Sequence, residues 1–158
     1  MPRIGFGFDT HKLEINRDFW LGGIRISHDK GATGHSDADV LIHAICDALL
    51  GAAGLGDIGT HFPDTSPEFK GIDSKVLLKR TRDLILEKGY SIGNLDTTIV
   101  LQNPKISSYV PEMIITLAEV LKTDKSRISV KAKTSEKLGF IGREEGLSAY
   151  AVALLQES

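Results

Sequence analysis

Apolar side chains recur at the spacing of an α-helix between residues 37 and 55, the most regular stretch of the chain. The apolar positions are Val40, Leu41, Ala44, Ile45, Ala48 and Leu49. This period of three and four residues predicts a helix over Asp37–Leu55. Glycines at positions 51, 54 and 56 mark its end, and either Ser36 or Asp37 is expected to cap its start, since a short oxygen side chain accepts from free backbone N–H groups there.

Other patterns along the chain predict strands and two more helices. Arg3–Thr10 is expected to be a strand. Phe19–Ser27, with Gly22-Gly23 inside it, is expected to be a hairpin or a bulged pair of strands. The remaining predictions are a loop over Gly56–Gly71, helices over Asp73–Lys88 and Ser108–Lys122, and strands over Ser91–Gln102, Ile128–Thr134 and Gly146–Gln156. The last segment is apolar enough for either a strand or a helix. Taken as a strand, it gives an α+β fold with helices packed on one face of a mixed sheet.

Composition limits the classes of protein that the chain can belong to. A length of 158 residues with 41% apolar content suits a single domain over residues 1–158. A net charge of −2 gives no basic field for nucleic acid, and no apolar stretch reaches the roughly 20 residues of a membrane span. The single cysteine, Cys46, fits a reducing cytoplasm, and the start shows no targeting peptide. A bacterial-type cytoplasmic protein is expected, and the uncovered face of its sheet suggests an oligomer.

Two ligand-type side chains lie at the end of the first predicted strand. Asp9 and His11 are separated by one residue, so they point to the same side of the strand. A carboxylate and an imidazole are both common zinc ligands, and a catalytic zinc site has three protein ligands and one open position. An isolated pair of this kind is more commonly a hydrogen-bonded Asp–His pair at the surface.

A second cluster, His35–His43, contains a candidate third ligand. His35, Asp39 and His43 are four residues apart and would share a helix face if the helix began early enough. His35, however, precedes the expected cap, whereas the apolar neighbours of His43 place it on the buried face. The hypothesis is therefore a site of Asp9, His11 and His43, with a hydrogen-bonded core histidine as the alternative for His43. Cys46 is expected to be a small buried thiol.

Two further segments carry weaker signals. Gly54–Gly59 matches G-x-G-x-x-G but follows a helix and opens a loop, so it is not a dinucleotide fingerprint. Lys131–Phe140 gathers lysines and hydroxyls that bind phosphate oxygens, and Glu136 is suited to a hard divalent cation. The alternative for this segment is a solvated polar turn.

Taken together, the ordered motifs resemble the 2-C-methyl-D-erythritol 2,4-cyclodiphosphate synthase family over Ile4–Leu155. The motifs that carry this resemblance are Ile4–His11, His35–Val40 with His43-Ala44, Asp47–Ala53, Leu55–Gly59, Phe62–Thr65, and Glu136–Phe140 with Gly142-Arg143. The resemblance implies a homotrimer with active sites at subunit interfaces. It also implies conversion of 4-diphosphocytidyl-2-C-methyl-D-erythritol 2-phosphate into the cyclic diphosphate and CMP, in the non-mevalonate pathway to isoprenoid precursors.

The same resemblance implies roles for individual residues. Asp9, His11 and His43 would hold one Zn²⁺ per subunit, Glu136 would hold Mg²⁺ or Mn²⁺, and His35 and Thr134 would stabilise the transition state. Substrate contacts would come from Asp9, His11, His35, Ser36, Asp57, Ile58, Gly59, Phe62, Pro63, Asp64, Thr65, Ser66, Val100, Leu101, Gln102, Asn103, Pro104, Lys105, Ile106, Lys133, Thr134, Ser135, Glu136, Phe140 and Arg143. Residues 100–106 and 133–136 would form the nucleotide pocket from across an interface. Phe8 and Arg143 would line a central trimer cavity for an isoprenoid-like diphosphate.

Two other functions use the same residues. A metal-dependent phosphohydrolase would use the three ligands to activate water. A non-enzymatic, zinc-stabilised trimer would only bind isoprenoid diphosphates. The hydrolase would release free phosphate without a cyclic product, and the binding protein would release no CMP.

Overall fold

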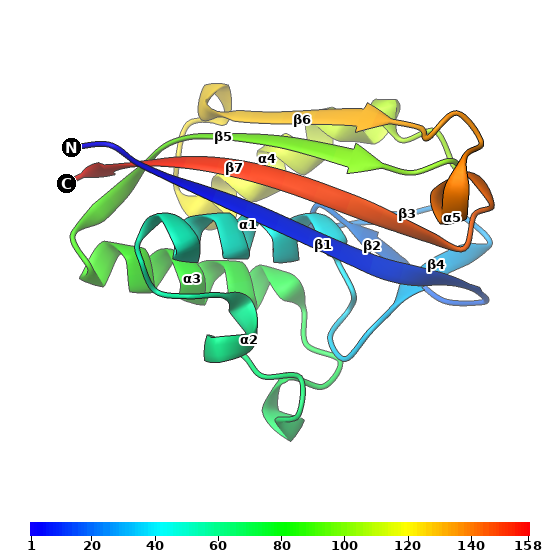
Figure 1. Cartoon of the computed structure of the whole chain (residues 1–158), viewed down its shortest axis with the longest axis horizontal. Helices are drawn as coiled ribbons and strands as arrows, with labels where there is room; N and C mark the ends of the chain where they lie inside the picture. The colour runs from blue at the N-terminus through cyan, green and yellow to red at the C-terminus, as the bar shows by residue number, and fades with distance from the viewer.

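Helices cover one side of a five-stranded sheet in the computed structural model, which describes all 158 residues (Figure 1). The strand order is β4-β1-β7-β5-β6, and β2 and β3 form a separate hairpin. The strands are β1 (Arg3–Ile15), β2 (Phe19–Leu21), β3 (Ile24–Ile26), β4 (Lys30–Thr33), β5 (Tyr90–Val100), β6 (Ile128–Lys133) and β7 (Gly146–Glu157). The helices are α1 (Val40–Ala52), α2 (Ile58–His61), α3 (Ser74–Glu87), α4 (Val110–Leu121) and α5 (Gly139–Gly142), with 3₁₀ turns η1 (Pro67–Phe69), η2 (Ser107–Tyr109) and η3 (Lys125–Arg127).

The sheet is mixed, as the sequence predicts. β5 and β6 are parallel, whereas β1 pairs antiparallel with both β4 and β7. The ambiguous segment at the C-terminal end is a strand, β7, and lies between β1 and β5 at the centre of the sheet. None of the helices combines the length and apolarity that crossing a membrane requires.

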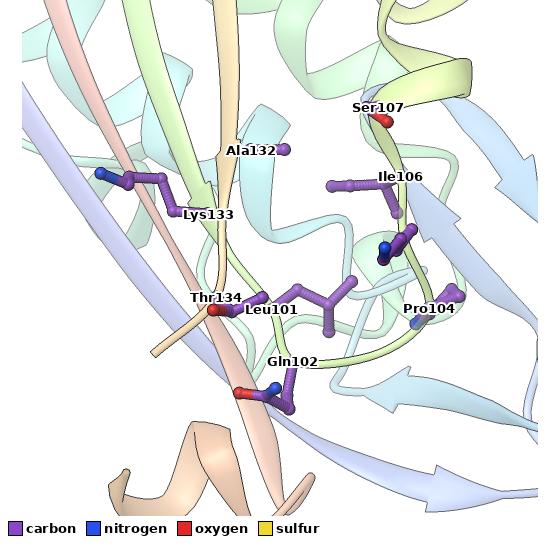
Figure 2. A pocket seen from close by; sticks show the side chains of 9 residues that line it. Leu101, Gln102, Pro104, Ile106, Ser107, Ala132, Lys133 and Thr134 are labelled. Carbon is purple, nitrogen blue, oxygen red and sulfur yellow. The ribbon is translucent and has the colours of Figure 1, made fainter. Parts of the chain in front are cut away.

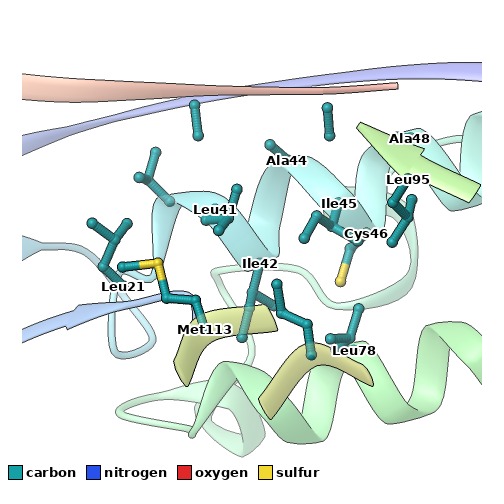
Figure 3. Close-up of a cluster of buried hydrophobic side chains, with 14 of the residues drawn as sticks. Leu21, Leu41, Ile42, Ala44, Ile45, Cys46, Ala48, Leu78, Leu95 and Met113 are labelled. Atoms are coloured by element: carbon teal, nitrogen blue, oxygen red, sulfur yellow. The ribbon is translucent and has the colours of Figure 1, made fainter. Parts of the chain in front are cut away.

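Helix α1 lies inside the molecule, between the sheet and the other long helices. In Figure 3, Ala44 and Ala48 point toward the strands, while Ile42 and Cys46 point toward Leu78 of α3 and Met113 of α4. These α1 side chains are fully buried, and a helix that is apolar on all sides is typically buried. The position of α1 matters for function because His43 lies on it.

Two glycines of β1 allow this close packing. A Cβ on Gly5 or Gly7 would overlap the backbone oxygen of Ala48 or Ala44 on α1. We expect Gly7→Ala to lower the free energy of unfolding by about 2–3 kcal/mol, because the helix must move away from the strand. Chemical denaturation of the metal-free protein measures this. Gly51→Ala is the matched control on α1, since its Cβ meets nothing within 4 Å; a loss as large in Gly51→Ala would contradict the packing argument.

The first helix begins later than predicted. Neither Ser36 nor Asp37 caps it: α1 starts at Val40, and Asp39 is the cap, with its side chain accepting from the backbone N–H of Ile42 at 3.1 Å. Asp39 also accepts from the N–H groups of Gly22 and Gly23 at 2.9 and 2.7 Å. The tertiary contact with the β2–β3 turn therefore selects the cap. Asp39 is fully buried in this role, so it is not a metal ligand.

Two other local predictions need correction. The segment Gly56–Gly71 is not loop throughout, because it contains α2 and η1. β1 continues to Ile15 rather than ending at Thr10, because β4 pairs with residues 12–15. The strand β4 was not predicted, and its sequence, Lys30–Thr33, shows no strong apolar alternation. The other predicted helices and strands are confirmed, with ends shifted by one or two residues.

Cys46 is fully buried, and burial raises the pKa of its thiol to about 12. The thiolate is the reactive form of cysteine. We therefore expect Cys46 to react with a disulfide reagent such as Ellman's reagent at pH 8 at least about 100-fold more slowly in the folded protein than in denaturant. Rapid labelling of the native protein would contradict this burial. The expectation of a small buried thiol is confirmed.

Candidate active site

Asp9, His11 and His43 meet where β1 passes the first turn of α1. The Oδ2 atom of Asp9 lies 2.7 Å from Nε2 of His11 and 3.1 Å from Nδ1 of His43. The same two ring nitrogens are 3.3 Å apart. One potential ligand atom from each residue thus falls within a single cluster. Strand alternation places the first two side chains on one side, as predicted, and α1 supplies the third.

The charges in this cluster suit a cation. Burial alone would raise the pKa of Asp9, but hydrogen bonds and charge from His11 and His43 lower it to about 2, so Asp9 is a carboxylate at neutral pH. Burial lowers the pKa of His11, whereas its hydrogen bond to Asp9 and the Asp9 charge raise it more strongly, and the net shift is upward. The partly buried carboxylate of Asp9 is therefore stabilised by hydrogen bonds and positive charge from the two imidazoles, and a bound cation would stabilise it in the same way.

The donor set fits zinc. Nδ1 of His11 lies 2.9 Å from the carbonyl oxygen of Thr33. Since a carbonyl only accepts, Nδ1 carries a proton, and in the neutral ring Nε2, which faces the cluster, is the nitrogen with the free lone pair. Ligand atoms around a tetrahedral zinc ion lie about 3.3 Å apart, close to two of the three separations here. One carboxylate and two imidazoles leave the fourth position open, as in catalytic sites.

A cavity of about 350 Å³ opens above this cluster. It is lined by Asp9, His11, Gly34, His35, Ser36, His43, Ile58, Gly59, Phe62, Asp64, Phe69 and Leu77. His35 lies in its wall rather than among the ligands, with Nε2 2.8 Å from the carbonyl oxygen of Ser66. Gly34, Phe69 and Leu77 were not predicted; Phe69 and Leu77 carry only an ordinary apolar signal.

Several predicted contact residues do not line this cavity. Asp57 instead caps α2, accepting from the backbone N–H of Thr60 at 2.9 Å. Ser66 acts through its carbonyl oxygen on His35, and neither Pro63 nor Thr65 is among the lining residues. Gly54 and Gly56 have positive φ after α1, so the G-x-G-x-x-G segment leaves a helix, which confirms that it is not a dinucleotide fingerprint.

A second, smaller cavity of about 120 Å³ lies at the ends of β5 and β6 (Figure 2). It is lined by Leu101, Gln102, Pro104, Lys105, Ile106, Ser107, Ala132, Lys133 and Thr134. Most of the predicted nucleotide segment is therefore gathered here, although Val100 and Asn103 do not line it, and Ser107 and Ala132 were not predicted. The two cavities share no residue.

Glu136 lies on the exposed turn that follows the second cavity. Its backbone N–H donates to Oγ1 of Thr134 at 3.2 Å, and its φ is 56°. Ser135 donates to the carbonyl oxygen of Leu138 at 2.7 Å. Glu136 is thus outside the Asp9–His11–His43 cluster. Phe140 and Arg143 line neither cavity; Arg143 is paired with Glu145 at 2.7 Å.

The fold and the cluster define a metal-dependent enzyme, because an open zinc-type donor set lies at the floor of a cavity. The chain matches the YgbB family model over residues 2–156 and belongs to that family. It is 60% identical to the 2-C-methyl-D-erythritol 2,4-cyclodiphosphate synthase of Phocaeicola vulgatus over 156 residues, 99% of this chain and 98% of the relative. These relatives confirm the resemblance seen in the ordered motifs. Since a cyclodiphosphate synthase is a lyase, the chain belongs to a family of lyases.

Two solved structures of related enzymes have the same fold as this chain. The bifunctional IspDF of Campylobacter jejuni matches with a TM-score of 0.97 and 43% identity, covering all of this chain and 43% of that longer one. A CDP complex of IspF from Plasmodium falciparum matches with a TM-score of 0.88 and 40% identity, covering 99% of this chain and 97% of that one.

Proposed function

We propose that the chain converts 4-diphosphocytidyl-2-C-methyl-D-erythritol 2-phosphate into 2-C-methyl-D-erythritol 2,4-cyclodiphosphate and CMP. Full-length relatives with this activity support the proposal. The observation that carries it is the Asp9–His11–His43 cluster at the floor of an open cavity. The CDP complex of a 40% identical relative supports a cytidine nucleotide as part of the substrate.

The reaction needs no nucleophile from the protein. An oxygen of the 2-phosphate attacks the β-phosphorus, a new P–O bond closes the ring, and the bond to CMP breaks with its electron pair leaving on CMP. All reacting groups belong to one polyanion, so the protein must fold that anion on itself and stabilise charge on the reacting phosphorus. Metal ions, Zn²⁺ on Asp9, His11 and His43 and Mg²⁺ or Mn²⁺ on Glu136, would supply positive charge and orientation.

Hydroxyl groups beside the first cavity and on the turn of Thr134 can donate to phosphate oxygens. Oγ1 of Thr134 already accepts from the N–H of Glu136, so its hydroxyl proton is free to donate. Ser36 accepts from the N–H of Ala38 at 3.2 Å and lines the first cavity. The imidazole of His35, held on the carbonyl of Ser66, would orient the reacting phosphates. The hydroxyls of Thr134 and Ser36 would donate in the transition state.

We propose that the active site forms between copies of the chain in a homotrimer. On one face of the sheet, Ile4, Phe6, Phe8, Tyr150 and Val152 are 39–74% exposed. Phe6 pairs with Val152 and Phe8 with Tyr150 across β1 and β7, which makes a continuous apolar surface of the kind that marks an interface. The same assembly would bring the second cavity of one copy to the metal cluster of the next. A central cavity for an isoprenoid-like diphosphate, with Phe8 and Arg143 in its lining, stays a prediction.

Phosphorus NMR tests the reaction directly. Purified protein with zinc and magnesium is expected to give the cyclic diphosphate and CMP in equal amounts. Free phosphate without a cyclic product would instead identify a phosphohydrolase, and an unchanged substrate spectrum would leave only a binding protein. A parallel sample stripped of metal by a chelator, and then restored with each metal alone, assigns the metal requirement.

A further inference from the structure

A buried chain of hydrogen bonds leads from the outer nitrogen of His43 away from the cavity. Nε2 of His43 lies 3.0 Å from Oγ of Ser74, the first residue of α3. Ser74 is fully buried, and its hydroxyl donates to Oδ1 of Asp37. Asp37 is held in turn by the backbone N–H groups of Ser74 and Asp39, at 2.9 and 3.1 Å.

The direction of each hydrogen bond in this chain is fixed. A carboxylate only accepts, and a serine hydroxyl has one proton. Since Ser74 gives its proton to Asp37, it can offer only a lone pair to His43, and Nε2 of His43 must carry a proton. In a neutral imidazole the other nitrogen then has the free lone pair. That nitrogen, Nδ1, is the one that faces Asp9 and His11.

We propose that Asp37 and Ser74 are positioning residues that fix His43 in the tautomer and ring orientation required for binding the metal through Nδ1. The proposal rests on the proposed zinc site. Neither residue lines the cavity, so both act through His43 and not on the substrate. Partners of this kind on metal-binding histidines set the ligand's tautomer and basicity.

A second serine provides an internal comparison. Oγ of Ser36 is also 3.0 Å from Nε2 of His43, but no carboxylate accepts its proton, and Ser36 is itself held only by the N–H of Ala38. The two hydroxyls lie at the same distance from Nε2 of His43, but only for Ser74 does a carboxylate fix the direction of the hydrogen bond. Only Ser74 is expected to control the tautomer.

The test is the zinc affinity of the full-length protein, measured at pH 7.5 by competition with a chromophoric chelator. Ser74→Ala should weaken zinc binding by about 10–100-fold, and Ser36→Ala by less than about 3-fold. Thr81→Val is the matched control, because it also removes a buried hydroxyl from α3, one that has no hydrogen-bond partner; its affinity should equal that of the wild type. Equal losses in Ser74→Ala and Ser36→Ala, or none in either, would overturn the proposal.

A second measurement uses only the wild-type protein. It therefore tests the proposal even if the Ser74→Ala variant does not fold. In zinc-loaded wild-type protein with ¹⁵N-labelled histidine, the proton of His43 should be on Nε2 and exchange slowly with water. A proton on Nδ1, or rapid exchange from Nε2, would also overturn the role of Ser74. Wild-type protein that binds no zinc would sink the proposed metal site itself, so the two failures are distinguishable.

Discussion

His43→Ala is expected to release zinc and to lower the rate of CMP formation by at least about 10³-fold, with the fold kept. His43 supplies one of three ligand atoms in the cluster, and a Lewis-acid metal contributes several kcal/mol of charge stabilisation, of which about 4 kcal/mol corresponds to this factor. The fold should persist because the His43 side chain is partly exposed at the cavity floor, while its neighbours Ile42 and Ala44 carry the packing.

Metal content after dialysis and steady-state CMP release measure the two effects, and circular dichroism checks the fold. His28→Ala is the control, since His28 precedes β4 and belongs to neither cavity. It should keep its zinc and its rate. A His43→Ala protein with a full complement of zinc would show that the cluster is not the metal site.

The three residues of the candidate metal site could be predicted from sequence because simple periodicities place them. The alternation of a strand puts Asp9 and His11 on one side, and apolar neighbours at helical spacing put His43 on the inner face of α1. Both inferences need only local geometry. The overall sheet-and-helix arrangement follows from the same periodicities, read over longer segments.

The helix cap could not be predicted, because Ser36, Asp37 and Asp39 are all good caps by residue type. The choice is made by contacts distant in sequence: Asp39 accepts from Gly22 and Gly23, and Asp37 is engaged with Ser74. The sequence alone also indicated no role for Ser74, because a serine is common at the start of a helix. Only the three-dimensional structure shows that its hydroxyl lies between Asp37 and His43.

Strand β4 could not be predicted from sequence for a different reason. Lys30–Thr33 contains a lysine and a glycine and shows no clear alternation, so its pattern does not indicate a strand. It forms because β1 extends past Asp9 and His11 and offers a free edge. The carbonyl of Thr33, which holds His11, is consequently also invisible in the sequence, although it completes the zinc-type site.

Mixed assemblies should recover activity from two inactive variants, His43→Ala and Glu136→Ala. His43 belongs to the metal cluster and Glu136 to the turn beside the second cavity, and the two cavities share no residue within one chain. If each active site joins the metal cavity of one copy to the second cavity of its neighbour, a mixed trimer contains one site with both residues intact. Random mixing of equal amounts in a cyclic trimer gives about one quarter of the sites intact.

We therefore expect protein co-refolded from equal amounts of the two variants to form CMP at about one quarter of the wild-type rate, while each variant alone is nearly inactive. Asp9→Ala mixed with His43→Ala is the control, because both changes damage the same cavity and no mixed site can be intact. In the proposed trimer, the apolar surface of Phe6, Phe8 and Val152 would supply the interface between neighbouring copies. Activity no higher than that of the single variants, in samples shown by native mass spectrometry to contain mixed trimers, would mean that each chain carries its whole active site.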